Sequence, residues 1–203
     1  MKRLGVYGGT FDPIHIGHLE VIAGAYRCLN LDTLLVVVAN QPWMKTDSRE
    51  ITPPEYRYEM TVRSVRELKN THYDLTGVEV SSIEIDKGTV SYTSDTIEDL
   101  RKAYLDCEIF LIIGQDIVGE LHAWKNTDYL QQEVTLVVVT RPGSYAKSEA
   151  PDGWKLFELG LSTPDISSRE VRDKIAKGES VESLVPIQAI RVINREGLYH
   201  IKR

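Results

Sequence analysis

The sequence predicts an α/β fold in which helices cover both faces of a doubly wound parallel sheet. Short runs of apolar, mostly β-branched residues recur along the chain, as expected of strands that are buried on both faces. Between several of these runs, apolar residues recur at helical spacing. Strands that alternate with helices favour parallel pairing, because each helix carries the chain back to the end of the sheet where the next strand starts.

The first strand, the helix after it and the second strand are the clearest elements. Residues 4–7 form a short apolar run that stops at Gly8 and Gly9, which indicates a buried strand. Apolar positions then follow helical spacing, so we expect a helix over residues 17–29. The run TLLVVVA at residues 33–39 predicts a second strand that is covered on both faces.

A loop and a long helix should come next. Residues 40–51 are polar and irregular, and we expect a loop there. The helix that follows should reach about Lys69. Thr52 is placed to cap this helix, Pro53 suits its first turn, and Glu55 would complete a capping box.

The remaining elements are predicted from apolar runs and helical spacing in the same way. Gly114 should end a strand, much as Gly8 and Gly9 end the first one. The whole pattern is Rossmann-like, and ligands of such folds bind beyond the carboxyl ends of the strands, where the strand order reverses. We expect strands within residues 77–85, 109–113 and 134–139, and helices at 94–104, from 167 and within 186–194.

Length and charge narrow the class of protein. With 203 residues, we expect a single domain over residues 1–203, with a C-terminal helical part from about residue 167. The formal net charge of −6 argues against a general nucleic-acid binder. A few local cations can nevertheless hold one anionic ligand against such a global charge.

The chain carries no sign of export or membrane insertion. No segment has the apolar length of a signal peptide or approaches the roughly 20 residues of a membrane helix. We therefore expect a cytoplasmic protein that does not bind membranes. Cys28 and Cys107 lie in mostly apolar surroundings and are expected to be buried free thiols. Whether the chain forms a homo-oligomer stays open.

The first candidate site is the segment GGTFDPIHIGH at residues 8–18. Paired glycines let a backbone turn sharply and approach a ligand closely, and the start of the next helix offers free N–H groups to an anion. His15 and His18 are three residues apart, so both rings can face one side. An imidazole donates hydrogen bonds whether neutral or charged, and two of them could stabilise a triphosphate. The alternative is a tight turn with two surface histidines; no further ligands complete a zinc site.

The second candidate site is ISSREVR at residues 166–172. Ser167 and Glu170 fit a capping box, which is a purely structural explanation. Ser168 and Arg172 are also four residues apart on one helical face, where a hydroxyl and a planar guanidinium would suit phosphate. Capping and phosphate binding are compatible at one helix start.

These two segments carry a resemblance to a known superfamily. Residues 9–18 resemble the HxGH motif of nucleotidyltransferases, a superfamily that also includes the class I aminoacyl-tRNA synthetases. Residues 166–172 are similar to the ISSxxVR phosphate motif of its adenylyltransferases. The resemblance implies that the second motif meets the triphosphate from the side opposite the two histidines, through Ser167, Ser168 and Arg172.

Further segments resemble the bacterial nicotinate mononucleotide adenylyltransferases, so that the likeness runs from about residue 3 to residue 199. Phosphopantetheine adenylyltransferases share the first motif but are typically shorter and lack the SYTxDT and LY patterns. The segments are SYTSDT at residues 91–96, IIGQD at 112–116 with Trp124 beyond it, RPG at 141–143, and the stretch from Val185 to the LY pair at 198–199.

The resemblance implies a reaction in which ATP and nicotinate mononucleotide give deamido-NAD and pyrophosphate. Magnesium is expected on the ATP phosphates rather than on protein side chains. No covalent intermediate is expected, so catalysis would be positioning and charge stabilisation. The residues that the resemblance assigns are His15, His18 and Arg172 for catalysis; Gly8, Gly9, Thr10, Phe11, Gly114, Asp116, Ser167 and Ser168 for ATP; and Lys45, Arg57, Thr93 and Trp124 for the mononucleotide.

Some of these assignments have plain structural alternatives. Trp124, expected to stack on the nicotinate ring beside Thr93, could be a core tryptophan. Lys45 and Arg57, offered as cations to a phosphate or to pyrophosphate, could be a solvated loop lysine and a helix-face arginine.

Two positions depart from the family pattern. Many members carry Pro-His-Lys after the second strand, where this chain reads PWMK at residues 42–45. Lys125 follows Trp124 where some relatives carry an aromatic residue. The alternative functions are a related enzyme acting on nicotinamide mononucleotide or phosphopantetheine, and a nucleotide-binding module without catalysis. An aminoacyl-tRNA synthetase fragment is disfavoured by the acidic balance and the short chain.

Overall fold

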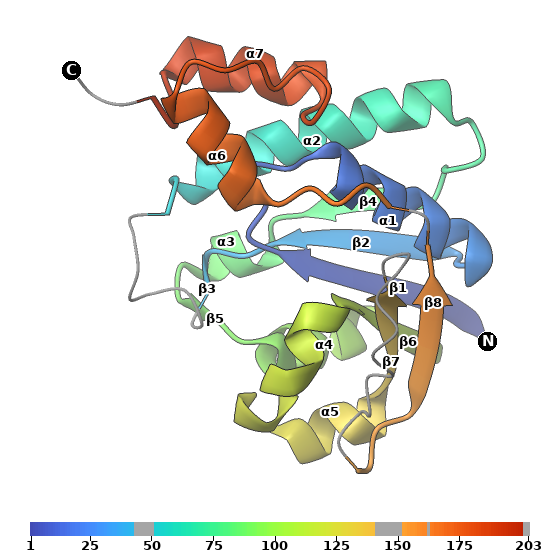
Figure 1. Ribbon diagram of the computed structural model, residues 1–203. Coiled ribbons are helices and arrows are strands. Elements are labelled where there is room, and N and C mark those ends of the chain that lie inside the picture. The colour runs from blue at the N-terminus through green and yellow to red at the C-terminus, as the bar shows by residue number, and fades with distance from the viewer. Residues whose placement is uncertain (43–50, 141–151, 162, 201–203) are drawn as a thin grey trace.

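A computed structural model describes residues 1–42, 51–140, 152–161 and 163–200. Within these ranges the chain forms a six-stranded parallel sheet of order β4-β2-β1-β6-β7-β8 and a small sheet that pairs β3 with β5 (Figure 1). The strands are β1 (Lys2–Gly9), β2 (Thr33–Val38), β3 (Gln41–Pro42), β4 (Val78–Ser81), β5 (Val90–Ser91), β6 (Cys107–Gly114), β7 (Val134–Thr140) and β8 (Leu156–Gly160).

Helices cover both faces of the large sheet, as predicted. In Figure 1, α1, α2, α6 and α7 lie above the sheet and α4 and α5 lie below it. The helices are α1 (Ile16–Cys28), α2 (Pro54–Thr71), α3 (Ile83–Lys87), α4 (Thr93–Ala103), α5 (Thr127–Glu133), α6 (Ser168–Ala176) and α7 (Ile187–Glu196), with a 3-10 helix η2 (Gln115–Ala123).

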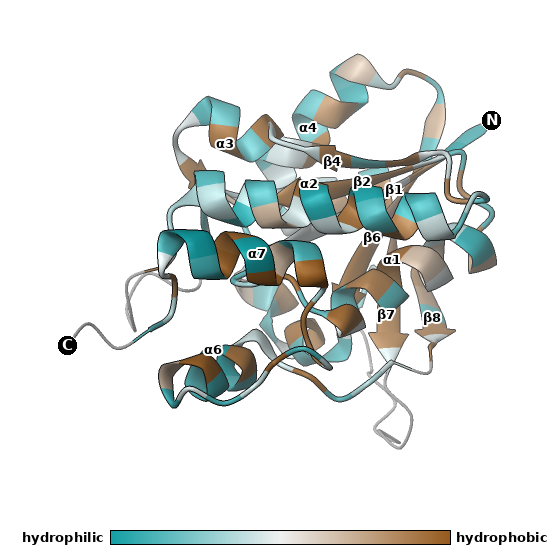
Figure 2. Cartoon of the chain, turned by 90° about the horizontal axis from the view of Figure 1, so that it is seen from above, coloured by the Kyte–Doolittle hydropathy of each residue, from teal (hydrophilic) through white to brown (hydrophobic). Residues whose placement is uncertain are grey.

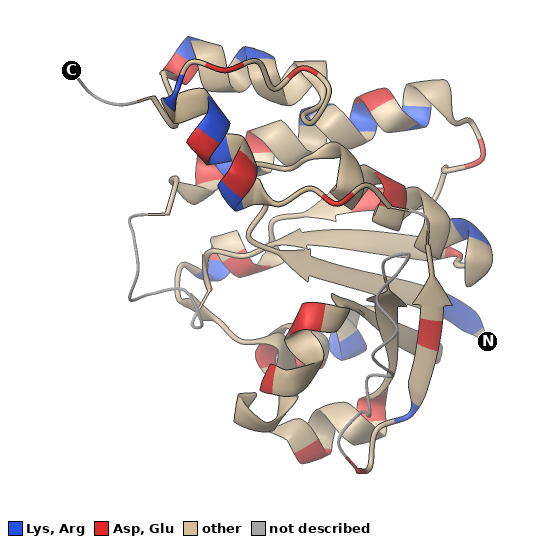
Figure 3. Ribbon diagram, viewed as in Figure 1, with Lys and Arg blue, Asp and Glu red and all other residues tan. Residues whose placement is uncertain are grey.

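The strands alternate their side chains between two hydrophobic cores. On β2, Leu34 and Val36 enter the core under α1, α2, α6 and α7, whereas Leu35 and Val37 enter the core on the α4 and α5 side. Both faces are therefore apolar, which explains the continuous apolar runs of the sequence. Figure 3 agrees with this, because most charged residues lie on helices and few lie on the inner strands.

The strand order reverses at β1. From β1 the chain first builds outward through β2 to β4, and it later returns to place β6 on the other side of β1. Gly9 pairs with Val38, and Gly114 is the last residue of β6. The glycines therefore end their strands as predicted, and both lie at the carboxyl edge of the sheet where Rossmann-like folds bind ligands.

A strand lies within residues 77–85 as predicted, but it occupies only the first half of that range. Strand β4 stops at Ser81, and α3 follows it directly. The backbone N–H of Asp86 donates to the Ser82 carbonyl across 2.8 Å, and the Ser82 hydroxyl donates to the Asp86 carboxylate across 2.8 Å. These local bonds close a helical turn, and they outweigh the alternating apolar pattern that suggested a strand.

The start of α2 also differs from the prediction. The N-cap is Pro53, no side chain caps the helix, and Pro54 occupies the first turn. Thr52 thus lies outside the helix and does not form the predicted capping box with Glu55. The Thr52 carbonyl instead accepts a hydrogen bond from Nε of Arg57 across 2.7 Å, so a side chain inside the helix fixes its entry.

Helix α7 lies alongside α2 on the outside of the molecule, as Figure 2 shows from above. Two hydrogen bonds of 3.0 and 2.6 Å run from the Arg195 guanidinium to the two oxygens of Glu59. This fork geometry fixes orientation as well as distance. The pair therefore sets how α7, and the residues that follow it, lie on α2.

The cysteines and the helix lengths complete the comparison with the predictions. Cys107 is buried as predicted, but Cys28 is exposed at the end of α1, so that prediction is wrong. In the described part of the chain, no helix is both long enough and apolar enough to cross a bilayer.

Candidate active site

The turn between β1 and α1, residues 9–15, is the centre of the candidate site, and we call it the phosphate turn. Its Phe11 has a φ of 49°, a region that bulky residues rarely adopt. The Phe11 ring folds back so that a Cβ on Gly9 would lie 2.7 Å from it, whereas a Cβ on Gly8 would meet nothing within 4 Å. Position 9 therefore requires glycine, and the backbone at Gly8 is open to a ligand.

The two histidines of the first motif lie against each other at the start of α1. Their rings stack with 3.6 Å between centroids and 23° between planes. His15 is buried and His18 is half-buried. A Cβ on Gly17 would lie 3.2 Å from the His15 ring, so the glycine between them leaves room for this stacking. The prediction that both rings face one side agrees with this geometry.

Helix capping fixes the proton on His18. The backbone N–H of His15, the N-cap residue, donates to Nδ1 of His18 across 3.1 Å. An acceptor Nδ1 carries no proton, so the neutral ring carries its proton on Nε2. Position N3 of a capping box usually holds glutamate or glutamine. Here a histidine does the same work and presents Nε2–H as a hydrogen-bond donor.

Three carbonyls of the phosphate turn accept hydrogen bonds from distant side chains. Thr10 O accepts from Arg57 across 2.8 Å, Asp12 O from Arg172 across 2.7 Å, and Pro13 O from the Ser168 hydroxyl across 2.9 Å. The Asp12–Pro13 peptide is cis. The structure thus brings Ser168 and Arg172 of the second motif to the first motif, although more than 150 residues separate them.

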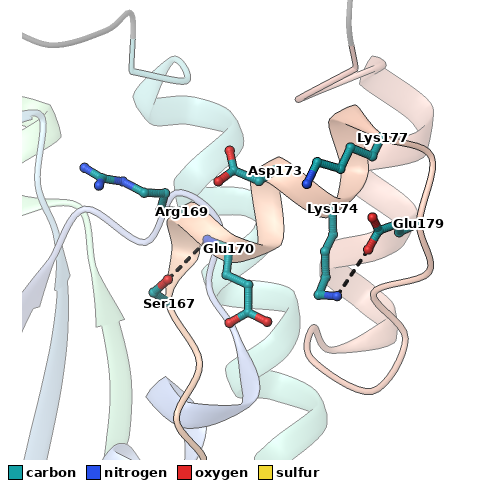
Figure 4. Close-up of a pocket in the computed structure, with 7 residues that line it drawn as sticks. All are labelled: Ser167, Arg169, Glu170, Asp173, Lys174, Lys177 and Glu179. Carbon is teal, nitrogen blue, oxygen red and sulfur yellow. Dashed lines mark hydrogen bonds and ion pairs between the residues drawn. The ribbon is translucent and has the colours of Figure 1, made fainter.

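Helix α6 begins with the predicted cap. Ser167 is the N-cap, and its hydroxyl accepts from the Glu170 N–H across 3.1 Å (Figure 4). Figure 4 also shows the outer face of α6, where a shallow depression is lined by side chains of both signs, including Lys174 and Glu179. This depression carries mixed charge, whereas Ser168 and Arg172 contact the phosphate turn.

Arg57 is not placed as the sequence suggested. Its side chain is fully buried, and it donates to the carbonyls of Thr10, Ala39, Asn40 and Thr52 at 2.6 to 2.8 Å. A guanidinium engaged in this way is not a cation available to the mononucleotide phosphate. Its role is to tie the phosphate turn, the end of β2 and the entry of α2 to one another.

Asn40, to which the sequence analysis gave no role, extends this hydrogen-bond network toward Thr93, one of the residues predicted to bind nicotinate mononucleotide. Its N–H donates to the Ser91 hydroxyl and its side-chain amide to the Thr89 carbonyl, both across 2.9 Å. Thr93 begins α4 two residues beyond Ser91. The only sequence signal was a single polar residue at the end of a long apolar run.

The predicted acceptor residues lie where α4 starts and where η2 ends. Thr93 is the first residue of α4. The first N–H groups of a helix have no partner within the helix, but that of Asp95 is bonded to the Tyr92 carbonyl across 3.1 Å. Trp124 follows η2 directly; it is half-buried, and its Nε1 has no partner among the described residues. Lys125 pairs with both oxygens of Asp95 at 2.9 Å and lies 4.8 Å from the centroid of the Tyr92 ring.

The remaining predicted residues fall at the edge of β6 or outside the described ranges. Gly114 ends β6, Asp116 is exposed just beyond it, and a Cβ on Gly114 would collide with the Asp116 carboxylate. Lys45 and the RPG turn at residues 141–143 lie outside the described residues. Within the described ranges, no group of three His, Cys, Asp or Glu residues could hold a metal ion.

Comparison with known proteins gives a consistent family. A family model described as cytidylyltransferase-like matches residues 6–174. A probable nicotinate-nucleotide adenylyltransferase of Clostridium tetani is 34% identical over 98% of this chain and 100% of its own length. One of Thermus thermophilus is 39% identical over 97% of this chain and 99% of its own length.

A solved structure gives the same fold. The nicotinic acid mononucleotide adenylyltransferase of Plasmodium falciparum, complexed with NaAD, superposes on 98% of this chain and 98% of its own, with a TM-score of 0.81 and 17% identity. That identity is low, so this likeness concerns the fold alone. The two bacterial relatives are more than 30% identical to this chain over nearly its whole length, and the family model covers most of it. This chain therefore belongs to the nicotinate-nucleotide adenylyltransferase family of cytidylyltransferase-like proteins.

Proposed function

We propose that this chain transfers the adenylyl group of ATP to nicotinate mononucleotide, which gives deamido-NAD and pyrophosphate in NAD biosynthesis. One observation carries the proposal: the two phosphate motifs meet at one turn, because Ser168 and Arg172 donate to the carbonyls of Pro13 and Asp12. The relatives that match nearly the whole chain are described as enzymes of this reaction.

The proposed chemistry is an in-line displacement at phosphorus. An oxygen of the mononucleotide phosphate attacks the α-phosphorus of ATP and forms a new P–O bond. The bond from the α-phosphorus to the oxygen that bridges it to the β-phosphate breaks, and that oxygen leaves with pyrophosphate. No protein nucleophile is required, so the chain's contribution is positioning and charge stabilisation. The charge that develops on the phosphate oxygens would be stabilised by Nε2–H of His18, the stacked His15 and the N-terminus of α1.

The second motif, residues 166–172, would hold the same phosphates from the side opposite His15 and His18. Arg172 and Ser168 already hydrogen-bond the phosphate turn, and Ser167 caps the helix that carries them. We assign the nucleotide floor to backbone groups of the first motif and to the end of β6. These residues are Gly8, Gly9, Thr10, Phe11, Gly114 and Asp116.

The start of α4 would select the acid over the amide. The free N–H groups and positive dipole end of a helix N-terminus favour a carboxylate, and a neutral carboxamide would satisfy them only in part. Thr93 supplies the first of these groups. Trp124 would offer its ring to the nicotinate. Lys45 stays a proposed ligand of the mononucleotide phosphate.

Magnesium fits this site as a partner of ATP rather than of the protein. The side chains gathered at the phosphate turn are mainly hydrogen-bond donors, and the Asp12 carboxylate there already accepts a hydrogen bond from a tyrosine. Mg²⁺ is usually bound by substrate phosphates, water and only one or two carboxylates. The ion would neutralise charge on the triphosphate while His15, His18 and Arg172 orient it.

The test is pyrophosphate release from Mg-ATP with each acceptor in turn. We expect the highest kcat/KM with nicotinate mononucleotide, a lower value with nicotinamide mononucleotide and none with phosphopantetheine. Absence of release with nicotinate mononucleotide would refute the proposal. We also propose that residues 1–203 act as one catalytic unit, since side chains of the C-terminal helical part hold the phosphate turn.

A further inference from the structure

The segment after α7 brings Tyr199 to the phosphate turn. The Tyr199 hydroxyl donates to Oδ1 of Asp12 across 2.7 Å, although the two residues are 187 positions apart. Asp12 is only 1% exposed, and Tyr199 is half-buried. This hydrogen bond joins a buried carboxylate of the first motif to a residue outside both motifs. The reaction proposed above assigns no role to Tyr199.

The backbone at the end of α7 is shaped to make this contact. The helix ends at Gly197 with a φ of 61°, and Tyr199 itself has a φ of 66°. The Leu198 N–H closes the helix on the Ile193 carbonyl across 3.0 Å. A left-handed backbone is unfavourable for a tyrosine, so the surrounding contacts have to hold it. The hydrogen bond to Asp12 is one such contact.

The Tyr199 phenol is a durable donor. Burial, followed by the negative charge of Asp12, raises the pKa of Tyr199 above its usual range, against the smaller opposite effect of a hydrogen bond with Thr52. The phenol therefore keeps its proton at neutral pH and up to at least about pH 10, the ordinary pKa of tyrosine. A hydrogen bond from a neutral hydroxyl to a carboxylate is stronger than one between two neutral groups.

Asp12 is held at two points. Tyr199 holds its carboxylate, and Arg172 holds its carbonyl. Three residues later the turn delivers His15, whose backbone N–H orients His18. We propose that Tyr199 is a positioning residue for the proposed adenylyl transfer: through Asp12 it fixes the phosphate turn that presents the two histidines to ATP. This inference rests on the proposed function.

The test compares the wild type with Tyr199→Phe, which removes only the hydroxyl. The dissociation constant for Mg-ATP is measured by calorimetry without acceptor, and kcat and KM are measured with nicotinate mononucleotide. We expect ATP affinity and kcat each to fall about tenfold, the order of effect that a loosened catalytic geometry has. The KM for the mononucleotide should change little, whereas the melting temperature should fall, because the buried Asp12 carboxylate loses this donor.

The chain offers a matched control in Tyr26→Phe. The Tyr26 hydroxyl accepts from the Gly77 N–H across 3.2 Å, just before β4 and at the opposite edge of the sheet from the phosphate turn. Removing it also deletes one tyrosine hydrogen bond, yet ATP affinity and kcat should stay at the wild-type values.

Asp12→Asn tests the same contact from its other side, and it also serves if Tyr199→Phe does not fold. Asparagine keeps an oxygen that accepts but loses the charge, so ATP affinity should fall less than in Tyr199→Phe. If Tyr199 acts through Asp12, the double variant should lose less than the sum of the two single losses.

Several results would overturn the inference. They are wild-type ATP affinity and kcat in Tyr199→Phe, equal losses in Tyr26→Phe, wild-type ATP affinity in Asp12→Asn, or additive losses in the double variant. If the wild type binds ATP but releases no pyrophosphate with nicotinate mononucleotide, the proposed function fails, and the ATP affinities of the variants still decide the role of Tyr199.

Discussion

Nδ1 of His18 accepts a hydrogen bond from the backbone N–H of His15 across 3.1 Å. The His18 side chain therefore helps to cap α1 and is also the side chain that would contact phosphate. One ring nitrogen is committed to the backbone, and the other carries the proton. This division separates two functions that simple deletion of the side chain would remove together.

Two substitutions of His18 should therefore differ. Asparagine places its oxygen near Nδ1 and keeps the cap, whereas glutamine places its amide near Nε2 and keeps the donor. We expect His18→Asn to fold normally and to lose about 2–4 kcal/mol of transition-state stabilisation, the range for one lost donor. His18→Gln should retain more kcat and a melting temperature near that of the wild type, because glutamine is a usual capping residue at this position. Steady-state kinetics and calorimetry check the pair; equal kcat values in both variants would contradict this assignment of the two nitrogens.

Arg57→Met should lower the free energy of unfolding by at least about 3 kcal/mol, because it leaves four backbone carbonyls without their donor. Urea denaturation measures this loss. The matched control is Arg63→Met on the same helix, whose exposed ion pair with Glu59 should matter by less than about 0.5 kcal/mol. A similar small loss for Arg57→Met would mean that water replaces its hydrogen bonds.

Lys125→Met should raise the KM for nicotinate mononucleotide about two- to fivefold without changing the KM for ATP, since a partly exposed ion pair has an effect of this order. Lys125 directly follows Trp124, and it forms an ion pair with Asp95 in the first turn of α4. The control is Lys102→Met, which removes an exposed ion pair between Lys102 and Glu98, both on α4. An unchanged KM in Lys125→Met would separate Lys125 from the acceptor end.

The Glu59–Arg195 pair should make stability depend on pH on the acid side. Hydrogen bonding to Arg195 lowers the pKa of Glu59, so the folded protein keeps this carboxylate charged to a lower pH than the unfolded chain does. The stabilisation is therefore complete above about pH 4.3, the ordinary pKa of glutamate, and it is lost as pH falls through the lower folded value.

This sign gives a measurable difference between the wild type and Glu59→Gln. The variant should melt at a lower temperature near neutral pH, and the gap should close as pH falls below about 4. Arg195→Gln should behave in the same way. A gap that widens in acid would show that the sign is wrong.

The inner strands could be predicted because each is buried on both faces. Leu34 to Val37 feed two cores in alternation, and such a run has few other structural explanations. Strand β8 gave no such signal: it lies at the edge of the sheet, and only Leu159 among its residues is buried. The short helices α3 and α5 depend on local bonds such as that between Ser82 and Asp86, which leave no periodic pattern.

Residue types at the site were easier to predict than their partners. Glycine pairs and spaced histidines are visible in a sequence, because the backbone and the helix dictate them. The partners of Arg57 are carbonyls, and a carbonyl is present at every position, so no residue type marks it. The same holds for Tyr199, whose contact with Asp12 depends on how the chain leaves α7.

The placement of the phosphate turn also has a consequence for synthesis on the ribosome. A nascent chain that has emerged as far as Gly160 already contains all six strands of the large sheet. It still lacks Ser168, Arg172 and Tyr199, which hold the turn near its own N-terminus. The sheet can therefore form first, whereas the contacts that hold this turn can form only after the C-terminal helices have been synthesised.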